Sequence, residues 1–443
     1  MRVGHHAAAI ALLGLGACAA QDPAPAAAPP IALDAPLPAT TAIASPAAID
    51  HEAAARAKVR EMLARVARAR GLPITREVPS RVLNRDEVLT KIRAKVASEI
   101  PPDVVEHEGE LLAALELVPP EYDFVEGTYR LIQGRIAGFY EPLDHTMYLV
   151  DDLGDDEAEE TLAHELCHAL QDQSFDLKKL LTFTPGEGDR LSAGHAVAEG
   201  DAMSGMFDVT VGSAFNVPDA ALRKALALSN AVAETSEKTP HVLQESLTVP
   251  YADGFSFVQR RREAGGWAAV DSAWREMPAS TEQLLHPEKY ASREAPVAVP
   301  VPSLAALGPG FRAATHDVVG EQGLRLMFGE WLSEVKASEA AAGWGGDRYV
   351  IARRDDAADR HTIAVGWRLV MDSDRDAGEV AAALKKRFDA PCRERATLGP
   401  LAWQRRGRTI AVAAGPFERR GRQAKSAGNC AIAARWLTQI MGP

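Results

Sequence analysis

Two histidines and a glutamate in the stretch TLAHELCHALQDQ (161–173) have the types and spacing of a metal-hydrolase centre. His164 and His168 are four residues apart, so on a helix they lie on one face and can hold one ion through two imidazole nitrogens. Glu165 follows the first histidine and can reach a water on that ion without binding the ion. This is the HExxH pattern, in which zinc lowers the pKa of its water to about 7 and the glutamate acts as general base. The pattern predicts that both histidines are Zn²⁺ ligands and that Glu165 is catalytic.

The alternative is an ordinary helix that carries these residues by accident. A chance HExxH is expected on the order of a few hundredths of a time in a chain of this length and composition. Three features favour the functional interpretation: the stretch has a helical pattern, it follows a predicted hairpin, and the chain begins with an export signal. A catalytic zinc has three protein ligands, so a third one must be found.

We expect the third ligand on a second helix. Gln171 and Ser174 occupy the positions that would continue the motif as HExxHxxGxxH, which excludes that arrangement. Glu199 lies in AGHAVAEGDAMSG, where small residues would allow two helix backbones to approach closely. His195 is one turn away and competes with it, because imidazole is the commoner ligand. We predict that Glu199 binds the metal, with a solvated surface acid as the alternative, and that His195 lies behind it or on the cleft wall.

These two segments resemble the signature of the gluzincin metallopeptidases, the broad clan typified by thermolysin, in four residues: His164, Glu165, His168 and Glu199. The resemblance covers roughly residues 134–202. It implies a zinc-dependent peptidase in which a β-hairpin precedes the active-site helix, and the edge strand of that hairpin pairs with the substrate backbone. By that likeness the substrate-binding strand would contain Gly138, Phe139 and Tyr140.

The chain departs from thermolysin itself, in which the third ligand comes sooner and in a different local motif. It is more similar to uncharacterised bacterial exported proteins in which HExxH is followed by a helix that reads EGxA. The stretch PASTEQLLHPEKY (278–290) also resembles a recurrent segment of such proteins. Enzymes of this type usually add a donor that stabilises the oxyanion of the reaction. The candidates are Tyr251, His286 and Tyr290, and the alternative for each is a packing or surface role.

Two further residues belong to the motif helix. Asp172 lies one turn after His168 and could orient an imidazole from behind, with a surface acid as the alternative. Cys167 occupies a variable position of the motif, and we expect it to pack inward as a small hydrophobe.

The N-terminus has the pattern of an export signal. Arg2 precedes a short apolar run that is too short to span a bilayer, and LGAC at its end resembles the bacterial lipobox, in which Cys18 would be lipidated. The Ala- and Pro-rich segment that follows suits a semi-rigid tether. We expect a protein anchored by lipid to the bacterial cell envelope, with a plain secretory peptide as the alternative. In an exported chain Cys392 and Cys430 favour a disulfide over two separate thiols.

The composition is that of a globular protein: 443 residues, 47% hydrophobic and 25% charged, with a net charge of −12. The acidic balance argues against nucleic acid as the main partner. The segmentation favours the α+β class, with five expected segments: a signal peptide (1–17), a tether (18–48), an N-terminal helical region (49–120), a mainly helical zincin-like domain with a small hairpin (121–295), and a smaller α+β domain (296–443).

Local patterns predict several elements. Helices are expected at 49–70, from Asn84 or Asp86 onward, and at 103–118, and we expect them to lie over the motif. A hairpin is expected at 136–140 and 146–150. Near the C-terminus, we expect strands around a helix at 377–388 and a last helix at 431–440.

The sequence therefore predicts a membrane-tethered zinc metallopeptidase that hydrolyses peptide bonds outside the cytoplasm. One alternative is a non-catalytic envelope lipoprotein in which the zinc only holds two helices together. Another is a zinc amidase that acts on cell-wall peptide. Whether residues 49–118 form a removable pro-segment stays open.

Overall fold

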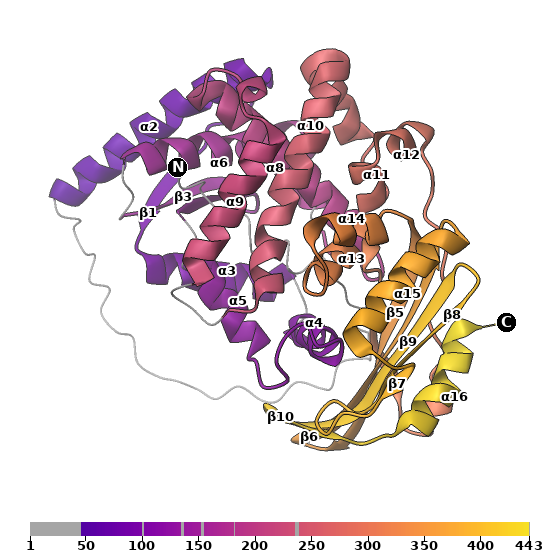
Figure 1. The fold of residues 1–443 in the computed structure, drawn as a ribbon. Helices are drawn as coiled ribbons and strands as arrows, with labels where there is room; N and C mark the ends of the chain where they lie inside the picture. The colour runs from indigo at the N-terminus through magenta and orange to yellow at the C-terminus, as the bar shows by residue number, and fades with distance from the viewer. Residues whose placement is uncertain are drawn as a thin grey trace, which may run out of the picture.

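The computed structural model describes residues 46–99, 102–133, 137–151, 155–180, 182–234 and 239–442. The expected signal peptide, the lipidation site Cys18 and nearly all of the tether lie outside the described residues. The predicted α+β class is confirmed: a mainly helical region precedes a region built on a large sheet (Figure 1). No helix in the described part of the chain is long and apolar enough to cross a membrane.

The N-terminal region contains a long helix, a short strand and three further helices: α2 (Pro46–Arg70), β1 (Ser80–Leu83), α3 (Arg85–Glu99), α4 (Pro102–Ala114) and α5 (Phe124–Gln133). Asn84 caps α3, and of the two predicted helix starts, Asn84 and Asp86, it is the one that the structure shows. Its side-chain oxygen accepts the N–H groups of Asp86 and Glu87, and the Glu87 carboxylate accepts the Asn84 N–H. This reciprocal pair satisfies donors that a helix start leaves free.

The predicted hairpin consists of β2 (Gly138–Glu141) and β3 (Thr146–Val150), which pair antiparallel. Residue 136, the first residue of the predicted hairpin, lies outside the described residues. β1 joins β3 in parallel and gives the order β1-β3-β2, so β2 is an edge strand.

Three long helices form the centre of the helical region: α6 (Asp155–Phe175), α8 (Gly188–Thr210) and α10 (His241–Arg275). The shorter helices around them are α7 (Leu177–Leu180), α9 (Asp219–Glu234), α11 (Thr281–Leu285) and α12 (Pro287–Ser292). α8 packs between α6 and α10 (Figure 1). The α8 and α10 backbones touch where Gly200 meets Gly254, because a Cβ on Gly200 would lie 2.0 Å from the Gly254 carbonyl carbon. Gly265 and Gly266 interrupt α10 with non-helical backbone angles.

The C-terminal region is a seven-stranded antiparallel sheet in the order β4-β5-β6-β9-β8-β7, with β10 paired to β9. Its elements are β4 (Arg312–Asp317), α13 (Gly320–Gly329), α14 (Glu334–Ala341), β5 (Trp344–Ala357), β6 (Arg360–Met371), α15 (Asp374–Phe388), β7 (Cys392–Arg393), β8 (Leu401–Arg406), β9 (Thr409–Arg420), β10 (Gln423–Ser426) and α16 (Cys430–Met441).

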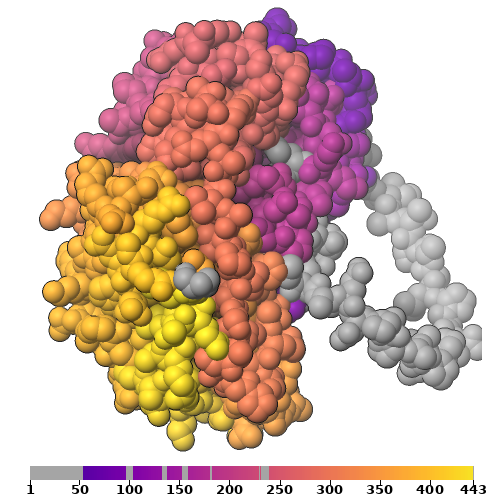
Figure 2. Space-filling view, turned by 90° about the vertical axis from the view of Figure 1, so that its right-hand side faces the viewer, coloured from indigo at the N-terminus to yellow at the C-terminus, as the bar shows by residue number. Residues whose placement is uncertain are grey.

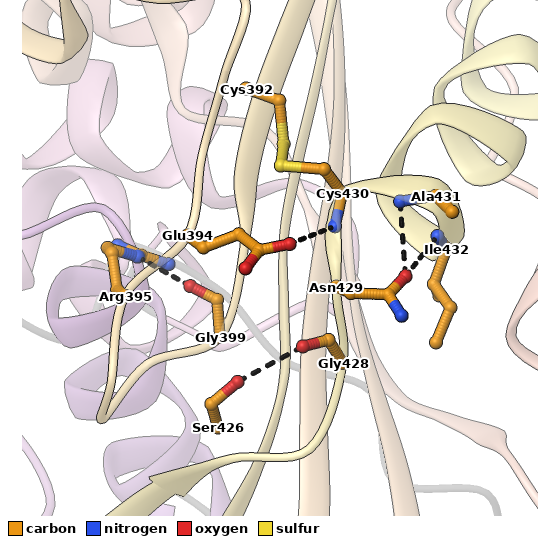
Figure 3. The surroundings of a disulfide bond; sticks show 10 residues. All are labelled: Cys392, Glu394, Arg395, Gly399, Ser426, Gly428, Asn429, Cys430, Ala431 and Ile432. Carbon is orange, nitrogen blue, oxygen red and sulfur yellow. Dashed lines mark hydrogen bonds between the residues drawn. A yellow bond between two sulfur atoms is a disulfide. The ribbon is translucent and has the colours of Figure 1, made fainter.

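The period of two along the strands divides this sheet into two packed faces. On β5, Val350 and Ala352 belong to the cluster around Trp436 of α16, whereas Tyr349 and Ile351 belong to the cluster that includes α15. The structure joins Cys392 and Cys430, the pair for which the sequence favours a bridge (Figure 3). The disulfide ties β7 to the first turn of α16.

The sequence predicts that the N-terminal helices lie over the motif. In the structure only some of them do. α2 packs on α6 and α8, but α4 packs against the C-terminal sheet. Glu110 of α4 forms an ion pair with Arg419 at 2.8 Å, and Glu116 lies among three arginines of the C-terminal region: Arg387, Arg393 and Arg395. α4 is buried nearly all round, so one neighbouring element cannot cover it. The helical and C-terminal regions therefore share a core, and their surfaces meet directly in Figure 2.

Candidate metal centre

Three side chains converge between α6 and α8. His164 and His168 project from one face of α6, and Glu199 reaches them from α8. The two Nε2 atoms of the histidines lie 3.1 Å apart. Glu199 Oε2 lies 3.1 Å from Nε2 of His164 and 3.6 Å from Nε2 of His168. All three residues are at least nine-tenths buried.

The chemistry of this donor set fits a tetrahedral zinc. Ligand atoms 2.0–2.1 Å from one ion at tetrahedral angles lie about 3.3 Å apart, close to the separations between these three atoms. Gln171 settles the tautomer of His168. Its amide nitrogen donates to the Ala198 carbonyl at 3.0 Å, so its oxygen faces His168 Nδ1 at 2.8 Å, and that nitrogen must carry the hydrogen. The lone pair of a neutral His168 is therefore on Nε2, toward the other two ligand atoms.

The electrostatics of the cluster favour a positive charge at its centre. Burial lowers the pKa of His164. Burial also acts to lower the pKa of His168, but Glu199, with smaller contributions from Glu165 and Gln171, outweighs it and raises that pKa to about 9. Burial acts to raise the pKa of Glu199, but the imidazoles of His168 and His164 together outweigh it and hold that pKa far below its ordinary value. A cluster that attracts a proton this strongly also attracts a metal cation.

Glu165 lies beside the ligands and is held at one oxygen only. Its Oε2 accepts the backbone N–H of Tyr140, on the edge strand β2, at 2.8 Å. Its Oε1 is buried and has no hydrogen-bond partner among the described residues. Burial raises the pKa of Glu165 to about 8. One carboxylate oxygen is thus fixed in place, and the other is free to hold a proton.

The strand predicted to bind substrate lies next to the catalytic candidate. Gly138, Phe139 and Tyr140 are all buried and form most of β2. Because β2 is at the edge of its sheet, only one side of its backbone pairs with β3. The bond from Tyr140 to Glu165 places this edge within reach of the metal centre.

Of the three oxyanion candidates, only Tyr251 lies beside the centre. Its ring centroid is 5.8 Å from that of His164, and its side chain is buried. His286 instead pairs with Glu321 at 2.9 Å. The Tyr290 hydroxyl donates to the Glu276 carbonyl at 2.9 Å, which uses its donor elsewhere.

His195 and Asp172 occupy different surroundings. His195 Nε2 lies 3.6 Å from Glu199 Oε1, the oxygen that does not face the two histidines of α6. Asp172 does not orient either of those histidines, so that prediction is wrong. It accepts the Tyr140 hydroxyl at 2.8 Å, and Arg76 and His145 also contact it. The residue that orients His168 is its neighbour Gln171, which sequence reasoning missed. The available signal was its spacing, since residues three apart on a helix share a face.

Cys167 also faces α8, at Gly205 and away from Glu199. It is a free, buried thiol within an apolar cluster, as the sequence predicts. A Cβ on Gly205 would lie 2.6 Å from its sulfur, so α8 closes over it.

Two other groups of potential ligands among the described residues are neutralised by cations of the protein. In the first, Arg419 makes a two-pronged contact with Glu110. In the second, Lys289 lies among three carboxylates: Glu282, Glu294 and Asp372. In both groups the protein itself supplies the positive charge, unlike in the centre between α6 and α8.

Comparison with known proteins covers only part of the chain. Residues 309–431 match a family model described as a domain of unknown function, DUF8575. This segment runs from β4 to the start of α16 and contains none of the residues of the metal centre. Neither the curated proteins nor the solved structures contain a match to the chain.

Proposed function

We propose that the protein is a zinc-dependent metallopeptidase that hydrolyses peptide bonds outside the cytoplasm, tethered to a membrane through Cys18. The observation that carries the proposal is the convergence of two imidazole nitrogens and one carboxylate oxygen with Glu165 beside them. His164, His168 and Glu199 would hold the zinc. Bound there, zinc would supply Lewis acidity toward the scissile carbonyl and an acidified water nucleophile.

The residues of the chain divide the remaining work. Glu165 takes the proton of the water at its free oxygen Oε1 and passes it to the leaving amine. The Tyr140 N–H holds Oε2, so the carboxylate cannot rotate away between the two transfers. The outer edge of β2 binds the substrate backbone by strand addition. The Tyr251 ring lies beside His164, where its hydroxyl is the best placed of the three candidates to meet an oxyanion.

The competing function is a structural zinc site in a non-catalytic lipoprotein. Such a site is closed by a fourth protein ligand. His195 is the nearest further imidazole, but its Nε2 faces the outer oxygen of Glu199 and not the cluster of ligand atoms. This placement favours the catalytic alternative. A zinc amidase for cell-wall peptide would use the same residues and differs only in substrate.

The test is to incubate the purified protein with a proteome-derived peptide library, with and without a chelator, and to identify new termini by mass spectrometry. We expect cleavage that the chelator stops and added zinc restores. Zinc content of two variants checks the ligand set: Glu199→Ala should lose most of its metal, and His195→Ala should retain it. A zinc-loaded protein that cleaves no peptide would overturn the proposed function.

Membrane attachment is tested separately. We expect Cys18→Ser to release the protein from membranes, since the proposed lipid would be attached at Cys18. Material that still sediments with membranes after a high-salt wash would contradict the anchor but not the peptidase activity.

A further inference from the structure

Two small cavities adjoin each other on the side of α8 that carries His195. The first, of about 30 Å³, is lined by His195 itself together with residues of α10, α11 and α13. The second, of about 40 Å³, lies between α4, α10 and α13. They share four lining residues: Ser246, Val319, Gly323 and Leu326. The two cavities therefore adjoin, and the first begins at His195, whose Nε2 lies 3.6 Å from Glu199 Oε1 of the candidate metal centre.

One stripe of α4 forms a wall of the second cavity. Glu108 shares this stripe with three leucines at helical spacings of three, four and seven residues: Leu111, Leu112 and Leu115. The remaining wall is almost entirely aliphatic: Leu117, Val242, Leu243, Leu326 and Met327. Part of it comes from α13, within the segment that matches the domain of unknown function.

Glu108 is the exception in these apolar surroundings. The residue is 2% exposed, and neither carboxyl oxygen has a hydrogen-bond partner among the described residues. Asp317 lies close enough to add negative potential, and one of its own oxygens also lacks a partner. Burial, with Asp317 in addition, raises the pKa of Glu108 well above its ordinary value. A carboxyl group in this state is stabilised by a cation that brings its own hydrogen-bond donors.

We propose that this cavity receives the end of a lysine side chain of the peptide substrate, an inference that rests on the proposed peptidase function. The methylene stem of lysine would pack against the leucines, and its ammonium group would donate to Glu108. A cavity of about 40 Å³ holds roughly three water-sized probes. That size suits the slender end of lysine better than a planar guanidinium or an aromatic ring.

The experiment compares lysine with norleucine, which has a similar unbranched stem but no ammonium group. Cleavage sites in the peptide library should show lysine enriched at one fixed position relative to the scissile bond. Matched peptides with lysine or norleucine at that position are then assayed for kcat/KM. We expect the lysine peptide to be preferred at least about tenfold, because truncating one partner of a buried charge pair commonly costs this much or more.

Two variants on α4 assign the preference to the carboxylate. Glu108→Gln should lose the lysine preference while it keeps its zinc and still cleaves the norleucine peptide. Glu106→Gln, an exposed position on the same helix, should keep the preference. Leu115→Phe fills the cavity without removing the carboxylate and should also lose the preference, which provides a second test if Glu108→Gln folds poorly.

The outcomes separate this inference from the function on which it rests. Cleavage without lysine enrichment, or an unchanged preference in Glu108→Gln, would overturn the lysine pocket and leave the peptidase intact. No cleavage of any peptide by the zinc-loaded wild type would overturn the proposed function and this inference with it.

Discussion

Two carboxylates only two residues apart on α8 have opposite surroundings. Asp201 and Glu199 are both buried, at 0% and 1% exposure. Asp201 accepts hydrogen bonds from Arg70 at 2.5 and 3.0 Å and from the Trp274 indole at 2.7 Å. Glu199 faces imidazole nitrogens, of which His168 Nε2 carries the lone pair when that ring is neutral.

The difference separates a carboxylate that only stabilises the fold from one that we propose binds a metal ion. Around Asp201 the protein supplies the positive charge and the donors itself, so nothing further needs to bind. Around Glu199 the nearby groups are imidazoles, which supply a positive charge only when protonated, and a bound metal ion would take the place of that proton. The contact of Arg70 also shows that α2 is built into the core of α8. Removing α2 as a pro-segment would leave Asp201 buried without its main partner.

The largest expected effect is the loss of kcat/KM on substitution of Glu165, which lies beside the proposed metal ligands. Glu165→Gln should lower kcat/KM by about 10²–10⁴-fold, the range typical of general acid–base catalysis. The amide keeps the shape and the bond from Tyr140, so zinc content should not change. The measurements are peptide turnover and metal analysis of the same preparation. Near-normal turnover would end the peptidase hypothesis.

The structural role of Asp201 is tested by substitution of its partner Arg70. Arg70→Met should destabilise the fold by about 3–5 kcal/mol, because it leaves the Asp201 charge buried and unpaired. Thermal unfolding of chelator-treated protein measures the effect without any metal contribution. Glu199→Ala should cost less stability in the same assay, and a larger loss there than in Arg70→Met would reverse the comparison. Arg70→Met combined with Asp201→Leu should recover part of the loss.

A third carboxylate, Asp317 at the end of β4, is an intermediate case. Asp317 Oδ1 accepts the N–H groups of Gly188 and Val318, whereas Oδ2 has no partner among the described residues. Burial raises its pKa from 3.8 to about 6. The folded state therefore keeps this proton between about pH 4 and 6, where the unfolded chain has lost it. Stability falls as the pH rises through that window, and the loss is complete above it.

Asp317→Asn removes this titration and retains an acceptor for both N–H groups. We expect the variant to be more stable than the wild type at pH 8, by on the order of 3 kcal/mol, and equal to it near pH 4. Melting temperatures of both proteins across this range provide the measurement. A difference that does not depend on pH would show that Asp317 is ionised throughout.

The smallest expected effect concerns the residue that orients His168. Gln171→Ala should weaken zinc binding by about 10–100-fold, as is typical for groups that hold a metal ligand from behind. The neighbouring Asp172→Asn is the matched control and should leave zinc affinity unchanged, since Asp172 contacts neither metal-ligand histidine of α6. Competition with a chelating dye measures both. A larger loss in Asp172→Asn would restore the assignment made from the sequence.

Elements that depend on local interactions could be predicted from the residues alone. Helical spacing brings His164 and His168 together whatever surrounds the helix. The cap at Asn84 and the hairpin before α6 are likewise short-range features that local residue types specify. Small residues around position 199 predicted a close approach of α8 to the motif helix, whereas in the structure Gly200 lies against Gly254 of α10.

Only the tertiary structure decided which segments meet across long distances. The four-residue strand β1 is too short to be stable alone and exists because β3 offers it a paired edge. α4 is buried nearly all round although it carries Glu108 and Glu110, and its sequence does not say which neighbours will bury it. Gln171 and Asp172 are equally polar neighbours on α6, and only the position of the Ala198 carbonyl selects Gln171 to hold His168. The spacing of residues on one helix fixes which of them share a face. Which distant segments pair with each other depends on the packing of the whole core.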